Sequence, residues 1–159
     1  MTIEAIHSLD RNGFVAALGG IFEHSPWVAE RTWAHRPFAT IKDLHQAMIH
    51  EVEAAHATEK LALIRAHPDL GAKANMSTLS AAEQAGAGLD QLTPAEYERL
   101  QILNAAYRDR FGFPFILAVK GGTKQDILQA LEQRLQADRE DELRTALEQI
   151  YRIALFRLT

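Results

Sequence analysis

The residue best suited to acid–base chemistry is His67, which stands where a predicted helix gives way to a loop. Pro68 follows it and biases the backbone of His67 away from helical dihedral angles. A histidine at such an irregular junction can accept or donate a proton near neutral pH. The same features fit a histidine that merely ends a helix, favoured there by the helix dipole, with Pro68 as the stop. From the spacing alone, this plainer interpretation is favoured over the catalytic one.

A second chemical candidate is the pair Ser80 and Glu83. The pattern Ser80-Ala81-Ala82-Glu83 fits a capping box, in which serine and glutamate each satisfy a backbone amide at a helix start. It also fits a helix N-terminus that turns a hydroxyl and a carboxylate toward a polar or anionic ligand. Both interpretations stay open, because the spacing is the same in each.

Two polar residues, Asn104 and Arg157, fall on apolar helical stripes. Asn104 follows Leu100 by four residues and precedes Phe111 by seven, so its side chain is expected to point inward. Arg157 follows Ile150 by seven residues, which places it at the edge of a core stripe. Two interpretations of Arg157 are open: a side chain that snorkels to solvent near the chain end, or a buried guanidinium aimed at a carbonyl or carboxylate.

The seven histidines suggest a metal site, but their spacing argues against one. His50 and His56 flank a sequence similar to a zinc-peptidase motif, yet they are six residues apart and face different directions on a helix. The absence of cysteine excludes disulfides, zinc–cysteine sites, iron–sulfur clusters and a cysteine nucleophile. We therefore expect no metal site.

Length and composition predict one soluble globular domain that spans residues 1–159, with 47% hydrophobic and 24% charged residues. A formal net charge of −4 makes nonspecific nucleic-acid binding a poor hypothesis, since such binding needs a basic face. The longest apolar stretch is short and contains Gly112 and Pro114, so no membrane span is expected. With no signal peptide apparent and no cysteine, we expect a cytoplasmic protein.

Helical periodicity dominates the chain, and the predicted fold class is an all-α, single-domain helical bundle. Helix starts are predicted at Asp10, Ser25, Thr40, Thr58, Ser80, Thr93 and Thr123, and at Asp138 or Asp141. The exception is the apolar run of residues 111–119, bounded by Gly121 and Gly122. A lone strand would lack a ladder partner, so we predict an extended connector buried between helices. Its backbone polar groups then need partners, which a ligand could supply.

Several motifs follow one another along the chain in a fixed order: Ser25-Pro26-Trp27-Val28-Ala29-Glu30, Arg36-Pro37-Phe38, His67-Pro68-Asp69-Leu70-Gly71, Ser80-Ala81-Ala82-Glu83-Gln84, Ala87-Gly88-Leu89, Asn104-Ala105-Ala106-Tyr107, Phe111-Gly112-Phe113-Pro114-Phe115 and Arg157-Leu158. Together they resemble one known family, the OHCU decarboxylases. The resemblance covers about residues 5 to 158, and the ordered set is more specific than any one motif. The family acts on 2-oxo-4-hydroxy-4-carboxy-5-ureidoimidazoline (OHCU) in urate breakdown and releases (S)-allantoin and carbon dioxide.

The resemblance implies an all-helical homodimer with a small-molecule ureide substrate and neither a metal nor an organic cofactor. His67 and Glu83 match the residues expected to be catalytic. The expected substrate-binding residues are Pro68, Ser80, Ala81, Ala82, Gln84, Phe115, Ile116, Leu117, Ala118, Val119 and Arg157. Within this set, residues 115–119 match a segment whose backbone meets the substrate, and Arg157 matches an arginine that holds a substrate oxygen.

Two other classes of function compete with this hypothesis. In a noncatalytic helical interaction domain, His67 and Arg157 would be structural and the connector would be only core. In a hydrolase acting on a related ureide, His67 would activate water. A product assay separates the three, because the interaction domain would show no turnover and the hydrolase would give ring opening or ammonia rather than carbon dioxide.

Overall fold

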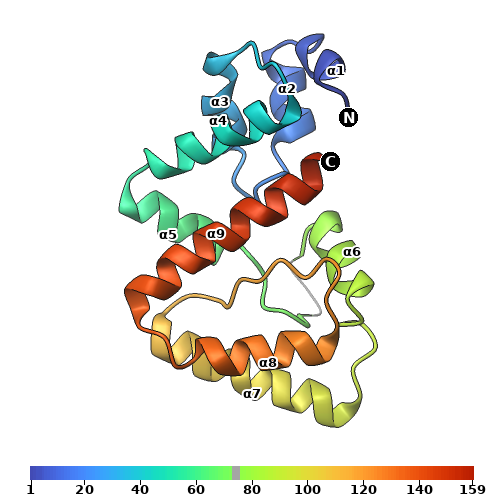
Figure 1. Cartoon of the computed structure of the whole chain (residues 1–159), viewed down its shortest axis with the longest axis vertical. Helices are drawn as coiled ribbons and strands as arrows, with labels where there is room; N and C mark the ends of the chain where they lie inside the picture. Colours follow the sequence, from blue (N-terminus) through green and yellow to red (C-terminus); the bar gives the residue numbers. More distant parts are fainter. Residues whose placement is uncertain (73–75) are drawn as a thin grey trace. The chain divides into compact units, whose positions relative to one another are not determined.

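The computed structural model describes residues 1–72 and 76–159, and all regular secondary structure in these ranges is helical (Figure 1). The predicted all-α class is therefore confirmed. The elements are α1 (Ile3–His7), α2 (Arg11–Leu18), α3 (Trp27–Thr32), the 3₁₀ helix η1 (Trp33–His35), α4 (Ile41–Glu53), α5 (Ala57–Arg65), α6 (Thr78–Gly86), α7 (Pro94–Phe111), α8 (Lys124–Arg134) and α9 (Arg139–Leu158).

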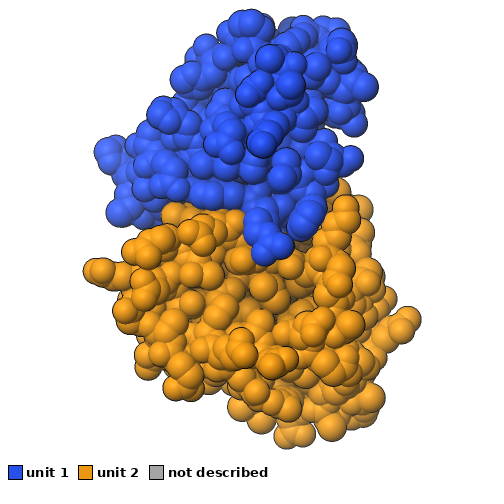
Figure 2. All heavy atoms as spheres, in the orientation of Figure 1, with its two compact units in different colours: residues 1–66, 151–159 blue, residues 67–150 orange. Residues whose placement is uncertain are grey.

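The chain divides into two compact units, coloured separately in Figure 2. Unit 1 comprises residues 1–66 and 151–159, and unit 2 comprises residues 67–150. Helix α9 belongs to both, because its residues 139–150 fall in unit 2 and its later residues in unit 1. Within the described ranges, no helix is both long and apolar enough to cross a lipid bilayer.

Most predicted helix starts are confirmed by side-chain caps. Asp10 Oδ1 accepts a hydrogen bond from Gly13 N at 2.7 Å, and the hydroxyl of Thr40 accepts one from Asp43 N at 3.1 Å. Capping boxes begin α7 at Thr93 and α8 at Thr123, and Asp138 Oδ1 accepts from Asp141 N just before α9. These starts were predictable because the cap and its partner lie within three residues of each other.

Two predicted starts differ in detail. Ser25 does not cap α3; Pro26 occupies the N-cap position without a side-chain cap, and the Ser25 hydroxyl donates backward to Glu23 O at 2.9 Å. Helix α5 begins one residue before the predicted Thr58, with His56 as its N-cap.

The predicted capping role of Ser80 is wrong. The N-cap of α6 is Ser77, whose hydroxyl accepts from Ser80 N at 3.1 Å. Ser80 consequently lies in the first turn of the helix, and its side chain is buried. A second serine three positions upstream offers the same local chemistry, and it is the one that starts the helix. Capping therefore no longer explains why a serine stands at position 80.

The predicted connector after α7 is confirmed: Figure 1 shows the chain between α7 and α8 as a segment without helix, and most of its apolar side chains are buried. Gly112 ends α7 with a φ of 80°, a conformation that suits glycine, and the chain then runs without regular structure to Thr123. Phe113, Phe115 and Ile116 are all at most 3% exposed. The ring of Tyr107 lies 5.9 Å from that of Phe113 and 5.4 Å from that of Phe115, so an aromatic cluster anchors the connector on α7.

In unit 1, α4 buries one apolar face. Leu44, Met48 and Val52 are fully buried, whereas Ile41 and Ala55 are only half-buried. The spacing of four residues keeps the buried side chains on one helix face.

Candidate functional site

His67 is the first residue of unit 2 and lies just beyond helix α5. The helix ends at Arg65, and Ala66 is its C-cap, so the imidazole belongs to the loop and not to the last helical turn. His67 is only 6% exposed, and the neighbouring Pro68 is half-buried. His67 thus directly follows the C-cap, beside the carbonyl end of α5, and both interpretations of its role stay open.

The loop after His67 is held by side chains from the helices of unit 2. Gln84 Oε1 on α6 accepts from Gly71 N at 2.8 Å. Arg108 Nε on α7 donates to both carboxylate oxygens of Asp69, at 3.0 and 3.2 Å. Since a loop has no ladder of its own, these contacts fix the backbone beside His67.

Asn104 points inward, as its place on an apolar stripe predicted. It is 4% exposed, and its Nδ2 donates to Leu70 O at 3.0 Å. Its Oδ1 is buried and has no hydrogen-bond partner among the described residues. Asn104 is therefore a third clamp on the same loop, contributed by α7.

Helix α6 presents its candidate residues on different faces. Ser80 and Gln84 are buried, Glu83 is half-buried, and Ala81 and Ala82 are exposed. Ser80 and Gln84 share a face because they are four residues apart. Gln84 has a demonstrated structural role through Gly71 in addition to its predicted role in binding.

The connector residues 115–119 are buried to different degrees. Phe115, Ile116 and Val119 are buried, whereas Leu117 and Ala118 are half-buried. Two of the peptide groups have side-chain partners: Ile116 O accepts from Arg134 Nη1 at 2.5 Å, and Ala118 N donates to Gln149 Oε1 at 3.0 Å. The sequence predicted that the backbone polar groups of this connector need hydrogen-bond partners, and Arg134 and Gln149 supply two of them.

Arg157 lies in unit 1, and its side chain is only 2% exposed. Its Nη1 donates to Glu23 Oε1 at 3.1 Å, to Gly20 O at 3.2 Å and to Ile21 O at 3.3 Å. The Glu23 side chain is fully buried, so the two charges compensate each other out of water. Of the two interpretations of Arg157, the structure supports the buried guanidinium.

Sequence reasoning missed several residues that these contacts involve. Glu23 lies 134 residues from Arg157, and no local pattern marks it as the partner. Arg134 and Gln149 contact the connector from α8 and α9, and their spacing resembles that of ordinary solvated helix residues. The sequence indicated only that such partners must exist, because a buried segment without a strand partner needs hydrogen-bond donors and acceptors from elsewhere.

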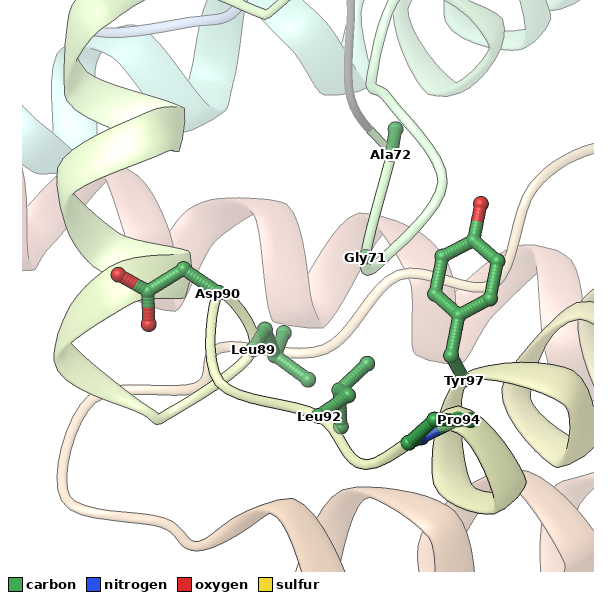
Figure 3. Close-up of a pocket in the computed structure, with 7 residues that line it drawn as sticks. All are labelled: Gly71, Ala72, Leu89, Asp90, Leu92, Pro94 and Tyr97. Atoms are coloured by element: carbon green, nitrogen blue, oxygen red, sulfur yellow. The ribbon is translucent and has the colours of Figure 1, made fainter.

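Unit 2 also contains a pocket of about 520 Å³, shown in Figure 3. It is lined by Gly71, Ala72, Leu89, Asp90, Leu92, Pro94 and Tyr97. In Figure 3 the Tyr97 ring and Asp90 lie on opposite sides of it, with the leucines between them. None of the predicted site residues is among these lining residues, but the lining residue Gly71 donates to Gln84.

Metal ligation finds little support in the described ranges, where no group of three or more histidine, cysteine, aspartate or glutamate side chains could hold an ion.

Comparison with known proteins identifies strong similarities over the whole chain. A family model described as OHCU decarboxylase matches residues 7–159. A 2-oxo-4-hydroxy-4-carboxy-5-ureidoimidazoline decarboxylase from Halalkalicoccus jeotgali is 49% identical over 158 residues, covering 99% of this chain and 90% of the relative. The uric acid degradation bifunctional protein of Bacillus subtilis is 53% identical over 157 residues, and there the match covers 99% of this chain but 32% of the relative.

Solved structures give the same result for the fold. A crystal structure of (S)-allantoin synthase superposes with a TM-score of 0.79 and 40% identity, covering 99% of this chain and 53% of that one. A structure of an OHCU decarboxylase, at 23% identity and a TM-score of 0.71 over 83% of this chain, supports the helical fold.

The clamped loop beside His67 leads to a prediction about Gly71. Its φ is +78°, and a Cβ at this position would lie 2.6 Å from Cδ2 of the fully buried Leu100. We expect Gly71→Ala to lower the free energy of unfolding by about 2 to 4 kcal/mol, from backbone strain and overpacking together. The measurement is denaturant unfolding followed by circular dichroism.

Gly86→Ala is the matched control, because Gly86 ends α6 without a positive φ, and a Cβ added there would meet no atom within 4 Å. This substitution should be neutral or stabilising by up to about 1 kcal/mol. Equal effects of the two substitutions would show that the Gly71 loop is not held as described.

Proposed function

Because this chain belongs to the OHCU decarboxylase family, we propose that it decarboxylates 2-oxo-4-hydroxy-4-carboxy-5-ureidoimidazoline, releasing carbon dioxide and (S)-allantoin during urate degradation. The observation that carries this proposal is 49% identity to a decarboxylase of that name across 99% of the chain. The ureide is the substrate, and (S)-allantoin is the product.

Decarboxylation of this substrate requires the protein mainly to position it and to stabilise the developing charge. The substrate carboxylate lies on a carbon that also bears a hydroxyl and adjoins a ring carbonyl. Loss of carbon dioxide leaves negative charge that delocalises into that carbonyl, so neither a metal nor a Schiff base is required. The protein must orient the leaving carboxylate, stabilise the developing enolate and deliver a proton to one face.

His67 is the residue proposed for proton transfer. Its burial and the clamps on Asp69, Leu70 and Gly71 support this role, because a general acid or base must be held at a fixed distance from the reacting atom. The imidazole either takes the proton of the substrate hydroxyl or gives one to the new carbon centre. Both routes use the same position.

Glu83 is the second proposed catalytic residue. It lies on α6 between the buried Ser80 and Gln84 and is half-buried itself. Near the substrate carboxylate it would either raise the ground-state energy by like-charge repulsion or relay the proton. Ser80, Ala81, Ala82 and Gln84 are proposed to bind substrate from the same helix.

The remaining proposed binding groups are Pro68, the backbone of residues 115–119 and Arg157. An extended backbone offers alternating donors and acceptors, which match those of a hydantoin ring and a ureido group. A guanidinium held by Glu23 and two carbonyls is already oriented, which favours its proposed use on a substrate oxygen.

We propose four further properties of the active protein. Catalysis needs no added cofactor, residues 1–159 form one domain, the protein is a homodimer, and it is cytoplasmic. The continuity of the family match over residues 7–159 and the sharing of α9 by both units support the single domain. The absence of cysteine is compatible with the reducing cytoplasm.

The direct test generates the unstable substrate from urate with the two enzymes that precede this step. Addition of this protein should accelerate the appearance of optically active (S)-allantoin and of carbon dioxide, with a chelator present and no metal added. Polarimetry follows the product. Only slow, racemic allantoin would overturn the proposal, and ring opening or ammonia without carbon dioxide would indicate a hydrolase.

His67→Asn tests the proton-transfer role. We expect kcat/KM to fall by roughly 10² to 10⁴, the usual contribution of a general acid or base, with little change in Tm. His50→Asn is the control, because His50 is exposed on α4. If His67→Asn lowered Tm but left turnover near normal, His67 would be structural.

A further inference from the structure

Tyr107, Arg134 and Glu142 form a buried polar cluster in unit 2 that contacts the connector. None of the three is among the predicted site residues. The Tyr107 hydroxyl on α7 donates to Glu142 Oε1 at 2.5 Å, and Arg134 Nε donates to the same oxygen at 2.8 Å. The Glu142 side chain is 3% exposed and that of Arg134 is 14% exposed. Three helices, α7, α8 and α9, thus meet at one carboxylate.

The charges in this cluster are fixed by its surroundings. Glu142 lies in the first turn of α9, where the helix dipole favours a negative charge, and Arg134 balances it. Burial, together with the hydrogen bond to Glu142, raises the pKa of Tyr107, so the phenol stays protonated and remains a donor. The carboxylate therefore holds Arg134 in one orientation.

Held in this way, Arg134 contacts the connector at two points. Its Nη1 donates to Ile116 O at 2.5 Å, and its guanidinium carbon lies 4.4 Å from the centre of the Phe115 ring. The first contact fixes a peptide group, and the second is a cation–π contact that fixes the preceding side chain. Arg134 thereby determines how the chain enters residues 115–119.

Gln149 fixes the connector two residues further along. Its Oε1 accepts from Ala118 N at 3.0 Å. The C=O and N–H of one trans peptide group point in opposite directions. The bond to Ile116 O therefore turns the Leu117 amide away from Arg134, and the bond to Ala118 N turns the Leu117 carbonyl away from Gln149. Of the described residues, none is hydrogen-bonded to the Leu117 amide or carbonyl.

We propose that Arg134 and Gln149 are positioning residues of the decarboxylation, which orient the connector backbone so that it can hold the ureide. The inference rests on the proposed function, in which residues 115–119 bind the substrate. Neither residue touches the reacting atoms in this proposal; both act through peptide groups that they hold in place.

A purely stabilising role explains the cluster less well. A buried ion pair contributes little net stability compared with apolar residues of the same volume, because removing both charges from water is costly. Its bonds do, however, define geometry, since a planar guanidinium reaches the carboxylate and the carbonyl in fixed directions. This geometry is what a binding edge made of backbone requires.

The test compares two substitutions at Gln149, which is half-buried and, unlike Arg134, is not part of the ion pair with Glu142. Gln149→Leu removes the acceptor for Ala118 N, whereas Gln149→Glu keeps one. With substrate generated as above, we expect Gln149→Leu to raise KM about fivefold or more with a smaller change in kcat, and Gln149→Glu to restore KM to within about twofold. The Kd for (S)-allantoin, measured by calorimetry, should follow KM.

Glu148→Leu, at an exposed neighbouring position on α9, is the matched control and should leave KM and Kd unchanged. Arg134→Lys is the second test; it keeps a cation beside Glu142 but loses the planar fork, so KM should rise again. Unchanged KM and Kd in Gln149→Leu, with only a lower Tm, would overturn the inference. A wild-type protein without decarboxylase activity would instead overturn the proposed function on which it rests.

Discussion

Peptide groups without a helix or sheet ladder can be buried only if side chains, water or a ligand satisfy them. The connector between α7 and α8 is such a segment, and the helices of unit 2 supply hydrogen-bond partners for its peptide groups. Arg134 and Gln149 each satisfy one peptide group, and the aromatic rings of the connector pack on Tyr107. Burial and hydrogen bonding together give a non-helical backbone a defined shape inside a helical protein. A backbone edge of this kind suits a ligand rich in amide-like donors and acceptors, which is what a ureide is.

Helix side chains also hydrogen-bond to peptide groups of the other irregular segments near the candidate residues. Gln84 and Asn104 clamp the loop after His67, and Arg157 binds two carbonyls of the loop after α2 together with Glu23. In each case a helix side chain reaches a loop peptide group that has no ladder. This arrangement suits the proposed mechanism, because decarboxylation with charge delocalised into a substrate carbonyl needs groups held at fixed positions. Helix side chains hydrogen-bonded to loop peptide groups help to hold them there.

Local sequence patterns predicted most of the helix starts, whereas contacts between residues far apart in the sequence could not be predicted. The caps at Asp10, Thr40 and Thr93 depend on neighbours within three residues, so the sequence indicated them directly. Ser80 was mistaken for a cap because Ser77 offers the same chemistry one turn earlier. The period of α7 predicted that Asn104 points inward, but its partner is a loop carbonyl 34 residues away. Spacing indicated His67, Ser80, Glu83 and Arg157 as candidates, and the resemblance added the other binding residues. Glu23, Arg134 and Gln149 were found only in the structure, because their partners lie far away in the sequence.

The central claim is that His67 and the connector serve one ligand, and a crystal structure of this protein with (S)-allantoin tests it most directly. We predict that the ligand is hydrogen-bonded to peptide groups of residues 115–119, with the His67 imidazole within hydrogen-bond distance of it. Ile116 O and Ala118 N should keep their partners Arg134 and Gln149 in that complex. Allantoin bound instead in the pocket between Leu89 and Tyr97, without contact to the connector, would contradict the account.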